Sequence, residues 1–465
     1  MLAMPERVEQ SQQWQKKHLI VLFLAWKCLL LVIAACSPGP GYDTSALILS
    51  DSSPHRHIHF VNWPWINRLA LNLFRWDALY FVKSARQGYV YEQEWAFSRV
   101  YSATLESFVK CFSRNPDPPL LHFVWAGAAV SNISHLFSVL TLFKLLNIPL
   151  SNMHGGNVPF IACVLHILSP AGLFLSAPYS EALFAALNFS GMLSYVQARV
   201  AANASKSWTL RQDLGILGSA VFFGMATWIR GNGLLSGLIY LFDVVSFLPS
   251  TSMTHLRPNH VRRIAATFLA GIILGTMSIV PQYIAYQTYC DASLGSEARP
   301  WCHRTVPSIY TWVQSEYWNV GFLRYWTLPN LPLFLMAAPM LWLLFKSSVT
   351  YLRSSAQPSE IARVLRTSGK QTNKVPDTVI CDFPQLALPQ LVLAIAAATS
   401  FHVQIINRIS SGYPMWYLSV AEWMTAPNTK PDKGWRGTTS QFVVRGMVVY
   451  AIVQGVLFAG FLPPA

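Results

Sequence analysis

Long apolar segments recur along the whole chain, and no other feature of the sequence constrains its fold as strongly. Each is about 16 to 25 residues long, close to the ~20 residues that cross a bilayer as a helix. Lipid offers the backbone no hydrogen-bond partner, so segments of this length are expected to be helical. The sequence therefore predicts an all-α polytopic membrane protein with about eleven spans, at residues 19–36, 120–143, 158–175, 180–197, 214–229, 233–249, 264–288, 328–345, 386–403, 410–426 and 441–460.

The composition agrees with one membrane-embedded domain. Hydrophobic residues make up 53% of the 465 residues and charged residues only 12%, whereas a soluble chain of this length would form about three domains. A net charge of +14 could indicate nucleic-acid binding, but the basic residues are not gathered on one face or tail. We therefore treat residues 1–465 as a single multi-spanning domain, in which positive charge sets the orientation.

The distribution of Lys and Arg predicts a cytoplasmic N-terminus. In that orientation the cytoplasmic loops hold 19 of the 34 basic residues, and the longer opposite loops hold 13, in keeping with the positive-inside rule. The first apolar segment is interrupted by Lys27 and lacks a clear cleavage site, which favours an uncleaved signal anchor. Residues 37–119 and 289–327 then form lumenal loops, and residues 346–385 form a flexible, non-catalytic cytoplasmic loop.

The first lumenal loop holds the most distinctive polar stretch, residues 74–99, with the sequence FRWDALYFVKSARQGYVYEQEWAFSR. A helix over residues 68–86 would place Asp77 in the middle of an aromatic face, where a carboxylate costs free energy unless it is used. The alternative is an amphipathic helix on the membrane surface, with Asp77 capped by a backbone amide. The residues after Gly88, including Glu92, mix aromatic and charged side chains and suit a surface against lipid headgroups or a glycolipid.

Three further polar clusters are predicted to lie on the Asp77 side of the membrane. Glu181 follows Tyr179 and Ser180 at a helix start, where its carboxylate could equally be an ordinary dipole-favoured cap. Arg230-Gly231-Asn232 offers a guanidinium and backbone amides that suit a phosphate, although a headgroup anchor is the alternative. A last cluster follows the ninth apolar segment and contains Gln404, Asn407 and Arg408. Four polar clusters on one face predict a shared site.

Cysteine usage leaves two alternatives open. Cys290 and Cys302 lie in the 289–327 loop, where they could pair in an oxidising lumen or remain free thiols. The other five cysteines show neither metal-ligand spacing nor a C-x-x-C motif.

The chemistry of these clusters favours transfer from a lipid-linked sugar phosphate. The chain has no Walker loop, HExxH, G-x-S-x-G or dinucleotide fingerprint. It also lacks the D-x-D pair with which nucleotide-sugar enzymes commonly hold a metal. A lipid phosphate is already a fair leaving group, so the enzyme would need a general base for the acceptor hydroxyl and cations for the departing phosphate. Asp77 and the lumenal arginines supply both types.

The chain resembles the GPI mannosyltransferase 2 family, which adds the second mannose of the glycosylphosphatidylinositol core. The resemblance rests on motifs that span residues 74 to about 420: Arg75-Trp76-Asp77-Ala78, Tyr80-Phe81, Gly88-Tyr89, Glu92, Ala96-Phe97, Ser169-Pro170-Ala171, SAPYSEALF at residues 176–184, Arg230-Gly231-Asn232-Gly233, Gln404-Ile405-Ile406-Asn407-Arg408 and Tyr413-Pro414. It implies a GT-C glycosyltransferase fold in the endoplasmic reticulum membrane. The implied donor is dolichyl-phosphate-mannose, and the implied acceptor is the monomannosylated GPI precursor, extended through an α-1,6 bond.

The resemblance also implies roles for individual residues. By analogy, the reaction is a single inverting displacement in which an acidic residue of the first lumenal loop is the base. Asp77 matches that position, with Glu92 and Glu181 as the other candidates. The candidate substrate-binding residues are Arg75, Trp76, Tyr80, Tyr179, Ser180, Arg230, Asn232, Gln404, Asn407 and Arg408. No metal site is assigned, and a small accessory membrane subunit is allowed by the same analogy.

Two other functional classes remain as alternatives. One is a transferase that uses another lipid-linked sugar or another acceptor; protein O-mannosyltransferases usually carry an adjacent Asp-Glu pair in the first lumenal loop, and residues 37–119 have none. The other is a transporter, whose polar groups would line a pathway through the bilayer. Here the polar clusters lie mostly at one membrane face, which favours the transferase.

Overall fold

The structure is a computed structural model, which describes residues 6–38, 41–51, 64–148, 150, 156–204, 210–247, 258–290, 299–355, 381–426 and 433–462. The elements of this part are α-helices and short 3-10 helices, as the sequence predicted. Residues 356–380, which make up most of the expected cytoplasmic loop, lie outside it.

Each of the predicted apolar segments contains at least one helical element. In chain order they are α1 (Glu6–Cys36), α6 (Leu120–Leu146), α7 (Val158–Ile167) with η2 (Gly172–Leu175), α8 (Glu181–Ala204), α9 (Leu210–Ile229), η3 (Gly231–Ser236) with α10 (Gly237–Phe247), α11 (Pro258–Cys290), α13 (Leu331–Ser355), η7 (Pro384–Ala387) with α15 (Leu388–Thr399), η9 (Ser410–Gly412) with α17 (Met415–Thr425), and α18 (Lys433–Ala459). Within the described residues, five helices are long and apolar enough to cross a membrane, at Gln10–Cys36, Leu120–Leu146, Val261–Cys290, Leu328–Arg353 and Arg436–Ala459. The protein is therefore a multi-pass membrane protein.

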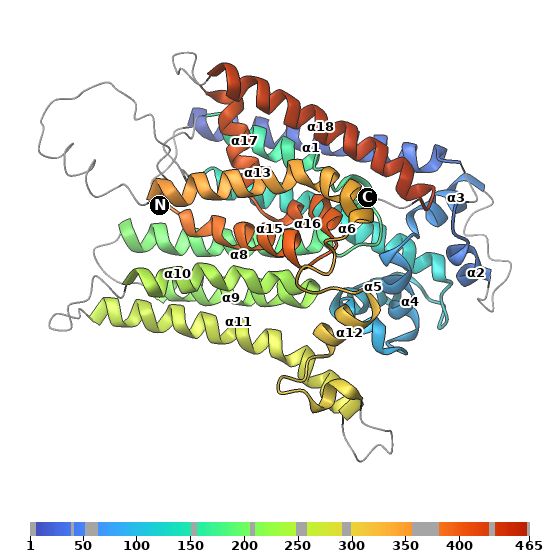
Figure 1. The fold of residues 1–465 in the computed structure, drawn as a ribbon. Helices are drawn as coiled ribbons and strands as arrows, with labels where there is room; N and C mark the ends of the chain where they lie inside the picture. Colours follow the sequence, from blue (N-terminus) through green and yellow to red (C-terminus); the bar gives the residue numbers. More distant parts are fainter. Residues whose placement is uncertain are drawn as a thin grey trace, which may run out of the picture.

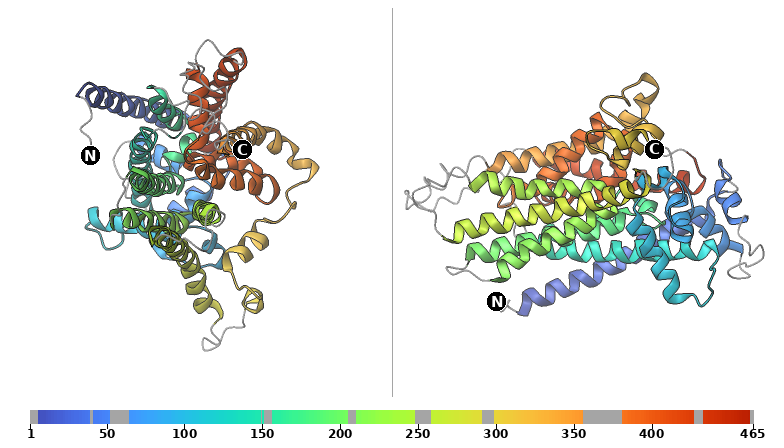
Figure 2. Two further views of the ribbon diagram at one scale, coloured as in Figure 1. Left: turned by 90° about the vertical axis from the view of Figure 1, so that its left-hand side faces the viewer. Right: turned by 90° about the horizontal axis from the view of Figure 1, so that it is seen from below.

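The long helices run side by side as a bundle, and a group of short helices lies at one end of it (Figure 1). This group consists of α2 (Ser45–Asp51), α3 (Pro64–Leu73), α4 (Asp77–Gln87), η1 (Glu92–Ala96), α5 (Arg99–Phe112) and α12 (Ile309–Tyr317). In the end-on view of Figure 2, α1 and α18 lie on one side of the bundle and α11 on the opposite side. The end that carries the short helices thus holds the described parts of both expected lumenal loops.

The core of the bundle is formed by α6, α7, α8 and α17. Helix α8 packs against α6 and α9, and α17 packs against α7. Each residue of α17 from Met415 to Trp423 is buried. In contrast, α11 and α13 expose many large apolar side chains, such as Phe268 and Leu335, as expected for helices that face lipid.

The predicted single helix over residues 68–86 is wrong, because the chain breaks in its middle. Helix α3 ends at Leu73 and α4 begins at Asp77. Between them Trp76 has φ 54, a left-handed conformation that costs a bulky residue about 1 to 3 kcal/mol and persists only where tertiary contacts hold it. Asp77 therefore starts a helix, where its carboxylate is favoured by the helix dipole.

Cys290 and Cys302 form a disulfide, which resolves the alternatives left open by the sequence. It joins the last residue of α11 to η5 (Pro300–His303). The neighbouring Trp301 is fully buried in a small apolar cluster with Ile309 and Val313. This cluster lies beside η1, because α12 packs against η1.

Candidate active site

Asp77 is positioned by the break between α3 and α4. The Tyr179 hydroxyl accepts a hydrogen bond from the Asp77 backbone N–H (3.1 Å) and donates one to the Arg75 carbonyl (3.1 Å), so it bridges the two sides of the break. Tyr179 is itself fully buried, and its carbonyl accepts a hydrogen bond from Ser131 of α6. The Asp77 side chain keeps an exposed fraction of 32%, so its carboxylate is accessible to solvent.

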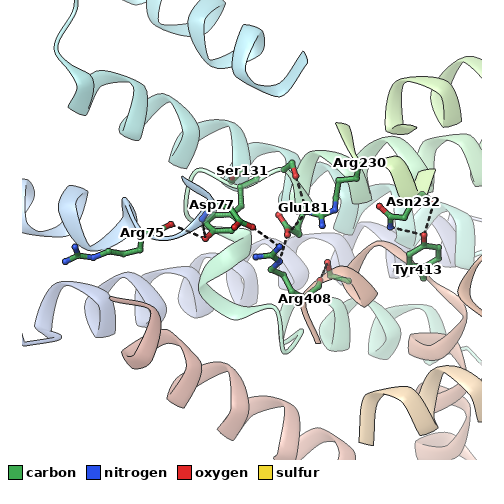
Figure 3. A network of polar contacts seen from close by, with 11 residues as sticks. Arg75, Asp77, Ser131, Glu181, Arg230, Asn232, Arg408 and Tyr413 are labelled. Carbon is green, nitrogen blue, oxygen red and sulfur yellow. Dashed lines mark hydrogen bonds and ion pairs between the residues drawn. The ribbon is translucent and has the colours of Figure 1, made fainter. Parts of the chain in front are cut away.

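Arg408 joins Asp77 to Glu181 (Figure 3). Its Nη2 lies 2.9 Å from Oδ2 of Asp77, and its Nε lies 2.7 Å from Oε1 of Glu181. The guanidinium also lies over the rings of Phe174 (5.0 Å) and Tyr179 (5.3 Å). Burial alone would lower the pKa of Arg408, but Glu181 and Asp77 outweigh burial and raise that pKa above its ordinary value. Arg408 is therefore a fixed positive charge beside Asp77.

Glu181 occupies the centre of the cluster. It is the first residue of α8, and its side chain is only 1% exposed. Arg230, at the end of α9, donates from Nη1 to Oε1 of Glu181 (2.7 Å) and to Oγ of Ser180 (3.2 Å). Two guanidinium groups thus converge on one carboxylate oxygen (Figure 3). Within the described residues the second oxygen, Oε2, has no hydrogen-bond partner, so Glu181 retains acceptor capacity.

Asn232 extends this polar row on the far side of Arg230. Its Nδ2 donates to the Tyr413 hydroxyl (3.0 Å), which donates in turn to the Asn232 carbonyl (3.3 Å). The row therefore runs from Asp77 through Arg408, Glu181 and Arg230 to Asn232 (Figure 3). The sequence predicted that these four clusters share a site, and one charged residue of each, Asp77, Glu181, Arg230 and Arg408, lies in this row.

Four other candidates lie outside this row. Glu92 accepts hydrogen bonds from Trp301 Nε1 (2.6 Å) and the Tyr317 hydroxyl (3.4 Å), so it ties η1 to η5 and α12. Arg75 donates to Oδ1 of Asn72 (3.2 Å), and its side chain points away from Asp77 (Figure 3). The remaining two candidates bind residues in α13 or just before it. Gln404 accepts a hydrogen bond from the Tyr325 hydroxyl (3.1 Å), and Asn407 donates one to the Met336 carbonyl (3.5 Å).

Tyr80 lies one helical turn beyond Asp77 on α4. Its ring stacks on Phe97 at a centroid distance of 4.3 Å and meets the edge of Trp318 at 6.3 Å. Burial and the nearby carboxylates of Asp77 and Glu94 raise the pKa of the Tyr80 phenol, so it stays neutral at physiological pH. Tyr80 thus places a neutral phenol and a stacked aromatic ring one helical turn from Asp77.

Several residues of the site were not predicted as site residues. Tyr413 was part of a recognised motif, Tyr413-Pro414, which is a signal that could have identified it. Ser131 and Phe174 lie within apolar segments and give no local signal of a role. Within the described residues no group of three or more His, Cys, Asp or Glu side chains has an arrangement that could hold a metal ion.

The family model and the curated relatives match nearly the whole chain. A family model described as "Mannosyltransferase (PIG-V)" matches residues 16–465. A protein named GPI mannosyltransferase 2 from Aspergillus oryzae is 40% identical over 463 residues, covering 97% of this chain and 96% of its own length. Proteins of the same name from Chaetomium globosum and Yarrowia lipolytica are 40% and 33% identical, over 97% and 96% of this chain. Among solved structures, the oligosaccharyltransferase AglB of Archaeoglobus fulgidus aligns with a TM-score of 0.42 and 12% identity, covering 95% of this chain and 56% of that chain.

Proposed function

The chain belongs to the mannosyltransferase (PIG-V) family, and from this premise we propose that it adds the second mannose of the GPI core. The donor is dolichyl-phosphate-mannose, and the acceptor is the monomannosylated GPI precursor, to which the mannose is joined by an α-1,6 bond. The observation that carries the proposal is the Asp77–Arg408–Glu181–Arg230 row, which places an accessible carboxylate beside two guanidinium groups.

The reaction follows from what this row can do. Asp77 takes the proton of the acceptor hydroxyl, and the hydroxyl oxygen attacks the anomeric carbon of the donor mannose. The bond from that carbon to the phosphate oxygen breaks, and its electron pair leaves with dolichyl phosphate. Arg408 and Arg230 stabilise the negative charge that grows on the phosphate. Because attack and departure occur on opposite faces of the sugar, the anomeric configuration inverts.

The surroundings of the three candidate carboxylates favour Asp77 as the base. Glu181 is buried against two cations, a setting that suits a counter-ion for the arginines better than a proton acceptor. Glu92 is held by Trp301 and Tyr317, in a position that suits assembly of the lumenal loops. Asp77 has one cationic partner, partial exposure and a rigid helix start, which are the properties expected of a base.

Tyr179 and Arg75, predicted as substrate-binding residues, are better assigned to positioning Asp77. The Tyr179 ring is fully buried and its hydroxyl is taken up by two backbone groups. The Arg75 side chain points away from the row. Substrate contact is retained for Trp76, Tyr80, Ser180, Arg230, Asn232, Gln404, Asn407 and Arg408.

For the membrane arrangement, we propose a GT-C-type bundle of eleven spans in the endoplasmic reticulum, with a cytoplasmic N-terminus. Residues 37–119 and 289–327 form the lumenal loops, and residues 346–385 the cytoplasmic one. The Cys290–Cys302 disulfide supports this orientation, because it lies at the same end as Asp77 and disulfides persist in oxidising compartments. A small accessory membrane subunit would be detected by co-purification.

Glycosylation provides a test of this orientation. The chain has N-x-Ser sequons at Asn132, Asn188 and Asn203, and none is expected to carry a glycan. Asn132 lies within α6, and Asn188 is fully buried in α8. Asn203 lies near the end of α8, which starts beside Asp77 and runs to the opposite end of the bundle. Treatment with an endoglycosidase should therefore leave the electrophoretic mobility unchanged. A shift that disappears in Asn203→Gln would contradict the proposed orientation.

The function itself is tested in cells that lack the second GPI mannose. Expression of this chain is expected to consume the accumulated one-mannose GPI intermediate and restore GPI-anchored proteins at the cell surface. Membranes from these cells should transfer labelled mannose from dolichyl-phosphate-mannose to that intermediate, and GDP-mannose should serve only where dolichyl-phosphate-mannose can be made from it. Transfer to a different glycolipid or to protein, with the intermediate left intact, would favour the alternative transferase.

A further inference from the structure

The last turn of α18 reaches the residues that hold Asp77, although it is almost 400 positions away in the sequence. Helix α18 packs against α1, α3 and η2, so its end lies between the helix before Asp77 and the segment before Tyr179. The motifs on which the family resemblance rests end near residue 420, so none of them lies in α18.

Two aromatic side chains at this end of α18 contact Trp76, at the break between α3 and α4, and Tyr179, whose hydroxyl spans that break. The Phe461 ring lies 4.9 Å from the Trp76 ring and 5.1 Å from the Arg75 guanidinium. The Phe458 ring lies 5.7 Å from the Tyr179 ring. Both phenylalanines are buried, Phe458 fully and Phe461 to within 3%. One helix end thus supports both the residue before Asp77 and the tyrosine that binds its backbone.

The backbone is strained on both sides of the contact between Phe461 and Trp76. Within the described residues four non-glycine residues have positive φ, and two of them, Trp76 (54) and Phe461 (55), contact one another. The Gly460 carbonyl, one residue earlier, accepts a hydrogen bond from the Tyr42 N–H (3.0 Å). A Cβ atom at Gly41 would lie 3.2 Å from the same carbonyl oxygen, so the backbone before α2 approaches Gly460 closely. Strained residues of this kind persist where the surroundings hold them, and they gather at functional sites.

We propose that the end of α18, through Phe461 on Trp76 and Phe458 on Tyr179, sets the position of Asp77, and that Phe461 is a positioning residue for mannosyl transfer. The Phe461 ring holds Trp76 in the backbone conformation from which α4 starts, and thereby directs the Asp77 carboxylate toward Arg408. The proposal rests on the proposed function only for its kinetic consequence, because the bracing contact is a property of the fold.

The kinetic test uses Phe461→Ala and Phe461→Leu, assayed in membranes with dolichyl-phosphate-mannose and the one-mannose acceptor. Misplacement of the base should lower kcat about 10- to 100-fold and leave KM for the donor within about twofold. Phe442→Ala is the matched control, because Phe442 lies on α18, the helix that precedes Phe461, with 68% of its surface exposed, and it should behave as wild type. The leucine variant keeps the apolar volume, so it tests the ring contact if the alanine variant fails to accumulate. Wild-type kcat in Phe461→Leu would overturn the proposal.

A second arm asks whether Phe461 acts through Trp76. Glycine adopts positive φ without strain, so in a Trp76→Gly background the backbone needs less support. Adding Phe461→Leu to Trp76→Gly should therefore lower kcat by a much smaller factor than in wild type. Equal factors in the two backgrounds would show that Phe461 acts elsewhere and would overturn the assignment.

Hydrogen–deuterium exchange separates failure of this proposal from failure of the proposed function. Phe461→Leu should increase deuterium uptake in peptides covering residues 74–81, where the Asp77 amide is bound to Tyr179, and leave residues 210–229 of α9 unchanged. This result can be read even if the wild-type protein transfers no mannose to the one-mannose GPI precursor. Unchanged uptake at residues 74–81 would contradict the brace whatever the activity.

Discussion

Replacing Asp77 with asparagine is expected to abolish mannosyl transfer while the protein stays in the membrane at its normal amount. The amide is nearly isosteric with the carboxylate, and it can still start α4, because the Tyr179 bridge uses the backbone of residues 75 and 77. However, an amide cannot accept the acceptor proton, and a positioned base contributes about 10²- to 10⁴-fold to such a step. Cells lacking the second GPI mannose should therefore keep the one-mannose intermediate when they express Asp77→Asn.

Asp117→Asn is a suitable control for this experiment. Asp117 is a half-exposed carboxylate of the same loop that also pairs with an arginine, Arg86 (3.1 Å), outside the Asp77–Arg408–Glu181–Arg230 row. Exposed pairs of this kind contribute at most about 1 kcal/mol, so rescue by this variant should be complete. Rescue by Asp77→Asn at normal abundance would remove Asp77 as the base, and Glu181→Gln and Glu92→Gln would then be the next variants to assay.

Replacing Arg408 with glutamine is expected to lower kcat/KM about 10²- to 10³-fold, the usual effect of removing one preorganised donor from a site where negative charge develops. The change removes the guanidinium that joins Asp77 to Glu181, so the base loses its partner and the departing phosphate loses a cation. Glu181 keeps Arg230, so the buried carboxylate is not left without a counter-ion.

The Arg408→Lys variant distinguishes charge from geometry. A lysine ammonium keeps the positive charge but cannot bind two carboxylates through a planar fork, so its activity should fall between those of wild type and Arg408→Gln. The control is Arg304→Gln, because Arg304 is an exposed arginine outside the row that lies over Trp312. Wild-type kcat/KM in Arg408→Gln, measured at matched protein amounts, would show that Arg408 serves neither the base nor the phosphate.

Local sequence patterns were sufficient to predict an all-helical membrane protein. A span must be apolar and about 20 residues long, so hydropathy alone located the helical elements, including short ones such as the α7–η2 pair. The alternation of spans then predicted which polar clusters share a membrane face, and Arg230 and Arg408 do meet at Glu181. The residue types needed for transfer could likewise be read from the chain, because acid–base and phosphate chemistry depend on side-chain identity.

Long-range contacts decided how those residues are arranged. The chain breaks at Trp76 because Tyr179 and Phe461, about 100 and 400 residues away, stabilise a conformation that local propensity disfavours. The same applies to Glu92, whose carboxylate binds Trp301 rather than joining Asp77. The amino-acid sequence thus specified a membrane bundle and the chemical groups of its site, since both depend on side-chain character along short stretches. Tertiary packing decided how these groups are arranged, because burial and ion pairing depend on which distant segments meet. It leaves Asp77 accessible, buries Glu181 between arginines and places α18 against α3 and η2.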